Sequence, residues 1–485
     1  MLSCNAELWS FFSKKNVFFA LLLLFWSIKA VAQHEEKIAK YFFVKIDSIT
    51  IEGNKRTRKA LILRELEFTS GDSILVSDLT GILERNRLRV LNLGIFSDAS
   101  LTISNWEENH HTDLHIKVNE SWYWFPSPVF ELVDRNFNVW WTEFNHSLKR
   151  ANFGGDYTQY NFTGHADVLN LTATTGYNQR LHMRYRTPSL NKKQTLGLQF
   201  GASYSRTDEV AVKTEMNKLV FFSYPGDFAI RRLSFDVMLT WRPGLFYTHG
   251  LSLENRQNFI ADTIIQEINP LFFSNGKSAQ KHFSLAYTFN FDNRDIRPYP
   301  TKGWSFLFEL RQNGLLPADD LFLTRTRLEV SKYTPFTSWL SLETGVRVRF
   351  SLPRSRPPYF NNQALGYGSD LVRGYEYYVM DGLDLGVIKT SLRGRFVKRM
   401  IFFPNIVKAH CNRCKPFEVK AYWSIQNDFG YANDPWFAFN NPLSNRVLYA
   451  YGIGLDVIMF YTKTMQISWM RTITGQSGIY LRTTL

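Results

Sequence analysis

The feature that most constrains this chain is the alternation of apolar and polar side chains beyond residue 122. Apolar residues, many of them aromatic, occupy every second position over segments of about ten residues, the length of a membrane-spanning strand. Clear examples are the segments 233–241, 282–292, 304–311 and 418–426. Because successive side chains of a β-strand point to opposite faces, this period of two predicts strands with one apolar and one polar face.

Such strands are typical of a transmembrane β-barrel. A barrel places aromatic residues on its lipid face and at both interfaces, and Phe, Tyr and Trp make up 16% of this chain. After residue 32 no apolar run approaches the roughly 20 residues that a membrane-spanning helix requires. We therefore expect a mostly β protein whose residues 122–485 form an antiparallel barrel, and the alternating segments number about sixteen.

The pattern also predicts where this barrel has its loops and its ends. Alternation is weakest at 209–229 and 261–280, which we expect to be long surface loops. The chain ends in an alternating segment, 478–485, which we expect to be the last strand. That strand would close the barrel against a first strand near 129–134.

The N-terminus has the order of features found in secretory signals. Lys14 and Lys15 precede an apolar stretch from Val17 to Ile28, and Ala30-Val31-Ala32 follows. A basic region, a short apolar run and a small-x-small site predict a signal peptide at 1–32 that is cleaved on export. Contact with outer-membrane lipids is then a better interpretation of the formal charge of +14 than nucleic acid, since the Lys and Arg residues are scattered.

Export also determines which cysteines remain in the mature chain and which oxidation state we expect for them. Cys4 would leave with the signal peptide, so Cys411 and Cys414 would remain, in a C-x-x-C arrangement. An oxidising periplasm favours a disulfide between them, with free thiols and a metal or redox role as alternatives.

Residues 41–121 combine strand and helix patterns. A strand around 44–51 is followed by a helix that Thr57 can cap and that runs to about Glu67. A second helix runs from about Ser77 to near Gly94, and two strands follow at 96–103 and 114–118. This β-α-α-β-β order predicts a small α+β domain. It resembles a POTRA domain through an ordered set of landmarks: Ile49, Ile51, Gly53-Asn54, Thr57, Arg64-Glu65-Leu66, Gly71-Asp72 and Leu93-Gly94-Ile95-Phe96.

Two motifs stand in the turns and loops of the expected barrel. The first, D-x-R-D…P-x-x-G, comprises Asp292, Arg294, Asp295, Pro300 and Gly303 at a short corner between strands. The second is Val372-Arg373-Gly374-Tyr375, inside a long loop from about 352 to 382. Together they resemble signatures of the BamA/TamA family of outer-membrane protein assembly factors, in which this loop folds back into the barrel.

The resemblance implies a carboxylate partner for Arg373, whose planar guanidinium can hold two oxygens at once. The family's F-x-D-x-G strand motif matches Gln426-Asn427-Asp428-Phe429-Gly430, although Gln426 stands where the family has Phe. By alternation Asp428 should face the lumen, and Asp456 is the alternative partner. Leu485 is a second departure, because barrels of this family end in an aromatic residue.

The family resemblance implies a protein that inserts or translocates other polypeptides at the outer membrane, with the N-terminal domain in the periplasm. It would act without nucleotide, through a lateral seam between the first and last strands. The implied partners are unfolded outer-membrane proteins, outer-membrane lipids and accessory periplasmic or lipoprotein subunits. A two-partner-type secretion pore and a non-specific channel or structural barrel are the alternatives. We expect no catalytic residues, cofactor or metal, because Gly276-Lys277-Ser278 and Gly475-Gln476-Ser477 each lack a glycine that their enzyme motifs require.

Overall fold

The computed structural model describes residues 43–106, 110–133, 137–191, 193–224, 227–273, 276–402, 417–459 and 463–484. The expected signal peptide (1–32), Cys411 and Cys414 lie outside these ranges. Within the described ranges, no helix combines the length and the apolar character needed to cross a membrane. The described residues form a small N-terminal α+β domain and a large antiparallel sheet.

The N-terminal domain has a four-stranded sheet of order β2-β1-β4-β3 and two helices. Its elements are β1 (Phe43–Glu52), α2 (Lys59–Leu63), β2 (Ser73–Leu75), α3 (Val76–Asn92), β3 (Phe96–Ser104) and β4 (His111–Glu120). The expected POTRA-like α+β domain is therefore confirmed. The structure adds the short strand β2, which pairs with β1 through Val44 and Ile74 and is too short to show a period.

The first helix of this domain differs from the expected segment 57–67. α2 spans only Lys59–Leu63, and its N-cap is Arg58, whose side chain makes no capping bond. Thr57 is buried, and its backbone N–H donates to the Glu120 carboxylate at 2.7 Å. Glu120 is 63 residues away in the sequence, so no helix signal could indicate this contact.

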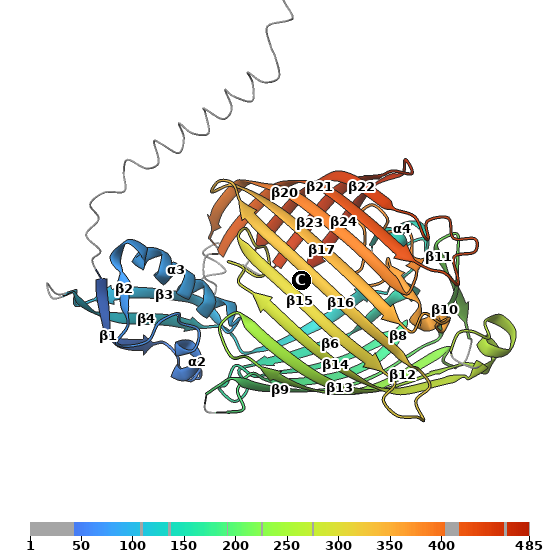
Figure 1. Cartoon of the computed structure of the whole chain (residues 1–485), viewed down its shortest axis with the longest axis horizontal. Helices are drawn as coiled ribbons and strands as arrows, with labels where there is room; N and C mark the ends of the chain where they lie inside the picture. The colour runs from blue at the N-terminus through green and yellow to red at the C-terminus, as the bar shows by residue number, and fades with distance from the viewer. Residues whose placement is uncertain are drawn as a thin grey trace, which may run out of the picture. The chain divides into compact units, whose positions relative to one another are not determined.

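Sixteen strands form the antiparallel sheet of the barrel, which confirms the predicted fold class (Figure 1). The strands are β5 (Trp124–Leu132), β6 (Ala151–Tyr160), β7 (Val168–Gly176), β8 (Asn178–Thr187), β9 (Leu196–Thr207), β12 (Ile230–Trp241), β13 (Tyr247–Ile260), β14 (Ala279–Asp292), β15 (Gly303–Asn313), β16 (Leu323–Pro335), β17 (Leu340–Leu352), β20 (Asp384–Ile401), β21 (Phe417–Asn433), β22 (Leu448–Met459), β23 (Lys463–Thr472) and β24 (Ser477–Thr484).

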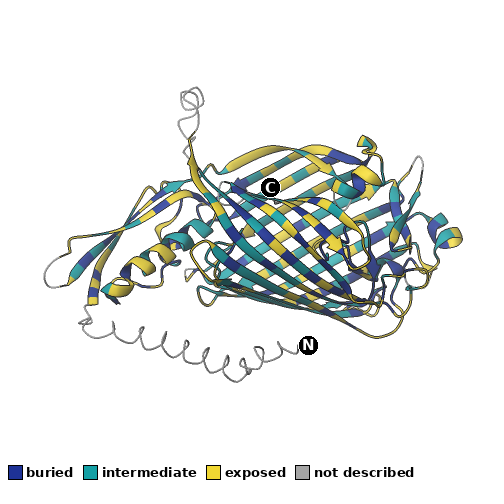
Figure 2. Ribbon diagram, turned by 90° about the horizontal axis from the view of Figure 1, so that it is seen from above, coloured by how far each residue is buried: buried dark blue, intermediate teal, exposed yellow. Residues whose placement is uncertain are grey.

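The two faces of this sheet differ in the way that the alternation predicts. On β12, Phe235, Val237 and Leu239 are 50%, 43% and 44% exposed on the outer face. On β21, Ser424, Gln426 and Asp428 are buried on the inner face. Figure 2 shows the same alternation of exposed and less exposed residues along the strands. Large apolar side chains therefore cover the outside of the barrel, where acyl chains replace water.

Both expected long loops carry structure of their own. Within 209–229, β10 (Glu209–Glu215) and β11 (Lys218–Ser223) form an antiparallel hairpin. Its turn residues Met216 and Asn217 both have positive φ, the requirement of a tight two-residue hairpin turn. Within 261–280, a π-helical turn covers Ile264–Ile268. Met216-Asn217 lacks the Asn-Gly or Asp-Gly sequence that marks such turns most clearly, so the hairpin was missed.

The strand order runs from β5 at one end to β24 at the other. β24 pairs with β23 on one side, and β5 pairs with β6. Among the described residues no ladder joins β5 to β24, so the expected pairing of the last strand with the first is not formed as a regular ladder. Instead, Asn138 of α4 (Phe137–Thr142) donates a side-chain hydrogen bond to the Ile479 carbonyl of β24.

Candidate functional site

The segment between β17 and β20 returns into the barrel and carries the Val372–Tyr375 motif. It contains a 3-10 turn (Tyr359–Asn361), the two short strands β18 (Gln363–Leu365) and β19 (Met380–Asp381), and irregular chain between them. Val372 and Tyr375 are fully buried, in a cluster with Ala450, Met470 and other residues of the barrel wall. Apolar packing therefore holds the motif against the last strands of the sheet.

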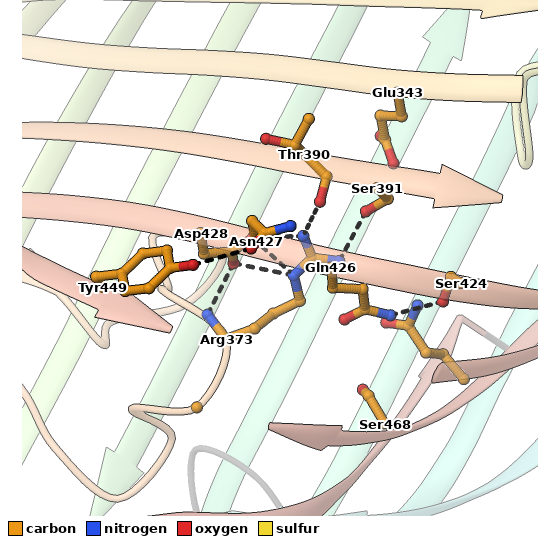
Figure 3. Close-up of polar contacts among 12 residues, drawn as sticks. Glu343, Arg373, Thr390, Ser391, Ser424, Gln426, Asn427, Asp428, Tyr449 and Ser468 are labelled. Carbon is orange, nitrogen blue, oxygen red and sulfur yellow. Dashed lines mark hydrogen bonds and ion pairs between the residues drawn. The ribbon is translucent and has the colours of Figure 1, made fainter. Parts of the chain in front are cut away.

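Arg373 makes a dense set of polar contacts at the tip of this segment (Figure 3). Its Nε lies 3.0 and 2.9 Å from the two carboxylate oxygens of Asp428 on β21, and its backbone N–H donates to the same carboxylate at 2.9 Å. Its remaining nitrogens donate to the Ser391 hydroxyl at 2.9 Å and to the Thr390 carbonyl at 3.2 Å, both on β20. The side chains of Arg373 and Asp428 are only 9% and 0% exposed.

The burial of Arg373 and Asp428 determines how much their ion pair contributes to the stability of the fold. Two buried charges repay their desolvation only when the geometry is good and the remaining donors are satisfied, and both conditions hold here. The structure thus places Arg373 on the carboxylate favoured by sequence alternation. Such a pair fixes the position of the segment, because any other position leaves a buried charge without a partner.

The alternative carboxylate, Asp456 on β22, is engaged elsewhere. It accepts hydrogen bonds from the Tyr299 hydroxyl at 2.6 Å and from the Gln466 amide at 2.7 Å. Tyr299 belongs to the connection between β14 and β15, and Arg393 lies over its ring at 4.3 Å. The β14–β15 connection therefore also reaches side chains on distant strands of the barrel wall.

The D-x-R-D…P-x-x-G residues build that connection. Arg294 Nε lies 2.8 Å from an Asp292 carboxylate oxygen, and the Asp295 carboxylate accepts hydrogen bonds from the Thr301 hydroxyl at 2.6 Å and the Thr301 N–H at 3.0 Å. Gly303 has φ +110, and a Cβ there would lie 2.6 Å from the Asn293 carbonyl oxygen. Only glycine fits this corner. The Pro300 carbonyl accepts a hydrogen bond from Arg393 of β20 at 3.3 Å.

Gln426, the departure from the family's strand motif, is buried in the lumen face of β21. Its amide donates to the Ser424 hydroxyl at 2.8 Å. Gly454 of β22 leaves room for it, because a Cβ at that position would lie 2.5 Å from the Gln426 amide nitrogen. The neighbouring glycine therefore accommodates a polar side chain where the family pattern has an aromatic one.

Three further residues of the site were missed by the sequence analysis. The Glu376 carboxylate accepts a hydrogen bond from the Gly374 N–H at 2.7 Å and forms an ion pair with Arg482 of β24. The Tyr480 hydroxyl of β24 donates to the Gly374 carbonyl at 3.2 Å. Alternation on the last strand could have placed Tyr480 and Arg482 on one face, but it contains no information about a loop partner.

On the opposite side of the segment, Asp370 lies between two arginines of the barrel wall. Arg327 of β16 donates to it at 2.9 and 3.1 Å, and Arg347 of β17 at 2.8 Å. The segment from Asp370 to Glu376 is thus tied by charged side chains to β16, β17, β21 and β24. Among the described residues, no group of three or more potential metal-ligating side chains is present.

The fold and this site define a class of protein: an outer-membrane β-barrel with a POTRA-like domain and a buried Arg–Asp pair that holds a loop in the lumen. The sequence matches the Omp85 superfamily domain over residues 161–386 and the POTRA domain, described as a surface antigen variable number repeat, over residues 44–121. These matches to an Omp85 superfamily domain and a POTRA domain support the resemblance to the BamA/TamA family.

Solved structures share the fold at low sequence identity. BamA from Haemophilus ducreyi lacking POTRA domains 1–3 is 14% identical, with a TM-score of 0.50 over 91% of this chain and 84% of that one. CdiB from Escherichia coli is 13% identical, with a TM-score of 0.53 over 91% of this chain and 76% of that one. No curated protein sequence matches the chain. The superfamily points to the outer membrane and to polypeptide insertion or translocation there.

Proposed function

We propose that this protein inserts outer-membrane polypeptides into the bilayer, without nucleotide, through the seam between β5 and β24. The observation that carries the proposal is the lack of a ladder between these two strands among the described residues. An unpaired strand edge is a template on which another chain can form backbone hydrogen bonds. In lipid such an edge is costly, because no water satisfies it, so a client strand that pairs with it is stabilised.

The N-terminal domain and the lumen segment have separate roles in this proposal. The domain would lie in the periplasm and bind unfolded clients by strand addition, a mode that uses backbone pairing and tolerates different sequences. The Arg373–Asp428 pair would hold β21 and the segment in one position, and the Glu376–Arg482 pair would extend that support to β24. Accessory periplasmic or lipoprotein subunits would act together with this POTRA-like domain.

The proposal is tested in cells in which production of this chain can be switched off. We expect slower conversion of newly made outer-membrane barrels to their protease-resistant, heat-modifiable forms in pulse-chase experiments. Normal barrel assembly with loss of one exported soluble protein would identify a secretion pore instead. Normal assembly and export, with steady ion conductance that survives removal of residues 43–121, would identify a channel.

A further inference from the structure

The backbone of β5 shows which of its residues face the seam. The Val133 N–H donates to the Arg150 carbonyl at 3.0 Å, and the Tyr123 carbonyl accepts from the Tyr160 N–H at 2.5 Å. The β5–β6 ladder between these two bonds has no register shift. Because the N–H and C=O of one residue point to the same side of a strand, the odd-numbered residues of β5 face β6. The even-numbered residues therefore face the seam.

Two of those seam-facing residues are prolines. Pro126 and Pro128 lie between Trp124 and Phe130 in the sequence of β5. Their nitrogen atoms point away from β6. Proline has no N–H, and within sheets it is confined to positions where no ladder bond is needed. A strand added to this edge would direct two of its carbonyls at Pro126 and Pro128 and find no donor. In a membrane those carbonyls have no water to replace the missing bonds.

The edge of β24 contains no proline, so no backbone donor is missing there. The Thr472 N–H donates to the Gln476 carbonyl at 2.8 Å, so the even-numbered residues of this hairpin face β23. Ser477, Ile479 and Leu481 consequently direct both N–H and C=O toward the seam. The Asn138 side chain confirms this orientation, because its amide donates to the Ile479 carbonyl. Asn138 therefore occupies one acceptor that a neighbouring strand would otherwise use.

We infer that the client strand pairs with the edge of β24 and that Pro126 and Pro128 prevent pairing with β5; this inference rests on the proposed function. The occupant is an extended segment of another polypeptide that alternates apolar and polar residues. Side chains of β24 set this requirement, since Ile479 is 64% exposed on the outer face whereas Tyr480 is 2% exposed on the inner face. The Asn138 amide donates to the Ile479 carbonyl in place of a backbone N–H, and the client strand displaces it when it pairs there.

The test places a photo-crosslinking amino acid at Ile479 or, as the matched control, at Phe130, which is also exposed on the outer face at 59%. Both proteins are made as full chains in cells and checked for heat-modifiable migration before irradiation. Client adducts from position 479 should exceed those from position 130 by on the order of tenfold, the effect of two lost backbone hydrogen bonds. Adducts mainly from position 130 would overturn the assignment of the edge and leave the proposed function standing.

Other outcomes separate the remaining possibilities. Adducts at neither position in a folded barrel would overturn both the inference and the proposed function, and adducts only with a second copy of this chain would overturn the choice of occupant.

The P126S/P128S variant restores two donors, so the yield from position 130 should rise severalfold. An unchanged yield would exclude the prolines as the cause. N138L should raise the yield from position 479, and no increase would contradict the displacement of the Asn138 amide.

Discussion

The Tyr480 hydroxyl, on the last strand, donates a hydrogen bond of 3.2 Å to the Gly374 carbonyl, beside the Arg373 that pairs with Asp428 on β21. One turn of backbone thus contacts both the interior of the sheet and the strand that borders the seam. Arg482, two residues along the same face of β24, forms an ion pair with Glu376. Through these contacts the position of β24 depends on the lumen segment as well as on β23.

Replacing Arg373 should destabilise the barrel strongly. R373A leaves the buried Asp428 carboxylate without its cation, and breaking a buried pair from one side costs about 3–5 kcal/mol. Urea-induced unfolding in detergent micelles measures this loss. The control is R354A, which removes a pair with Asp384 in which Arg354 is 42% exposed, and which should cost under about 1 kcal/mol. Equal losses in the two variants would contradict the bracing role.

The ion pair between Glu376 and Arg482 should respond to charge reversal. E376R places two cations together in a buried site, so the segment from 366 to 379 should become accessible to added protease in intact cells. The double variant E376R/R482E restores opposite charges and should recover most of the protection, because the two side chains interact directly. Additive effects of the two substitutions would show that the pair does not hold the segment.

Gly430, the last residue of the strand motif, is required for close contact with the lumen segment. A Cβ at Gly430 would lie 2.2 Å from Cγ2 of Val372, so G430A must displace Val372 and should cost about 1–3 kcal/mol. The control is G386A on the adjacent strand β20, where nothing lies within 4 Å of the added Cβ. Thermal loss of the heat-modifiable form measures both variants. Similar midpoints would exclude a packing role for Gly430.

The N-terminal domain should lose stability in acid through Glu120. Partial burial opposes ionisation of this carboxyl, but hydrogen bonds from the Thr57 and Arg56 N–H groups outweigh it and hold the pKa of Glu120 below its ordinary value. A carboxyl with a lowered folded pKa contributes stability above the unfolded pKa of about 4.3, and that contribution disappears as the pH falls through the folded pKa. Protease resistance of residues 43–121 in the full protein should therefore decline below about pH 5.

The control for this effect is E120Q, which cannot ionise. Its resistance should be lower than that of the wild type at pH 7, by under about 1 kcal/mol because Glu120 is partly exposed, and the difference should shrink as the pH falls. A wild-type decline that E120Q reproduces in full would assign the acid sensitivity to other groups.

Sequence alternation was sufficient to predict the sheet and its two faces. Ile425 and Phe429 lie outside and Asp428 lies inside on β21, as the period of two requires. The contacts of the lumen segment could not be predicted from the sequence. Asp370 and Glu376 contact the arginines of the barrel wall (Arg327, Arg347 and Arg482) only after the segment has folded back. Loop conformation is set by such long-range partners and has no period. The same reason explains why the contact between Glu120 and the Thr57 N–H was missed.

Reconstitution from purified components tests whether this barrel accelerates the insertion of other barrels. Purified full-length protein is incorporated into liposomes, a urea-unfolded outer-membrane barrel is added without nucleotide, and its folded, protease-resistant form is measured over time. We expect faster folding than in empty liposomes, with most of the gain lost in G430A and retained in G386A. Folding at the same rate in empty liposomes and in liposomes that contain this protein would rule out an insertion function.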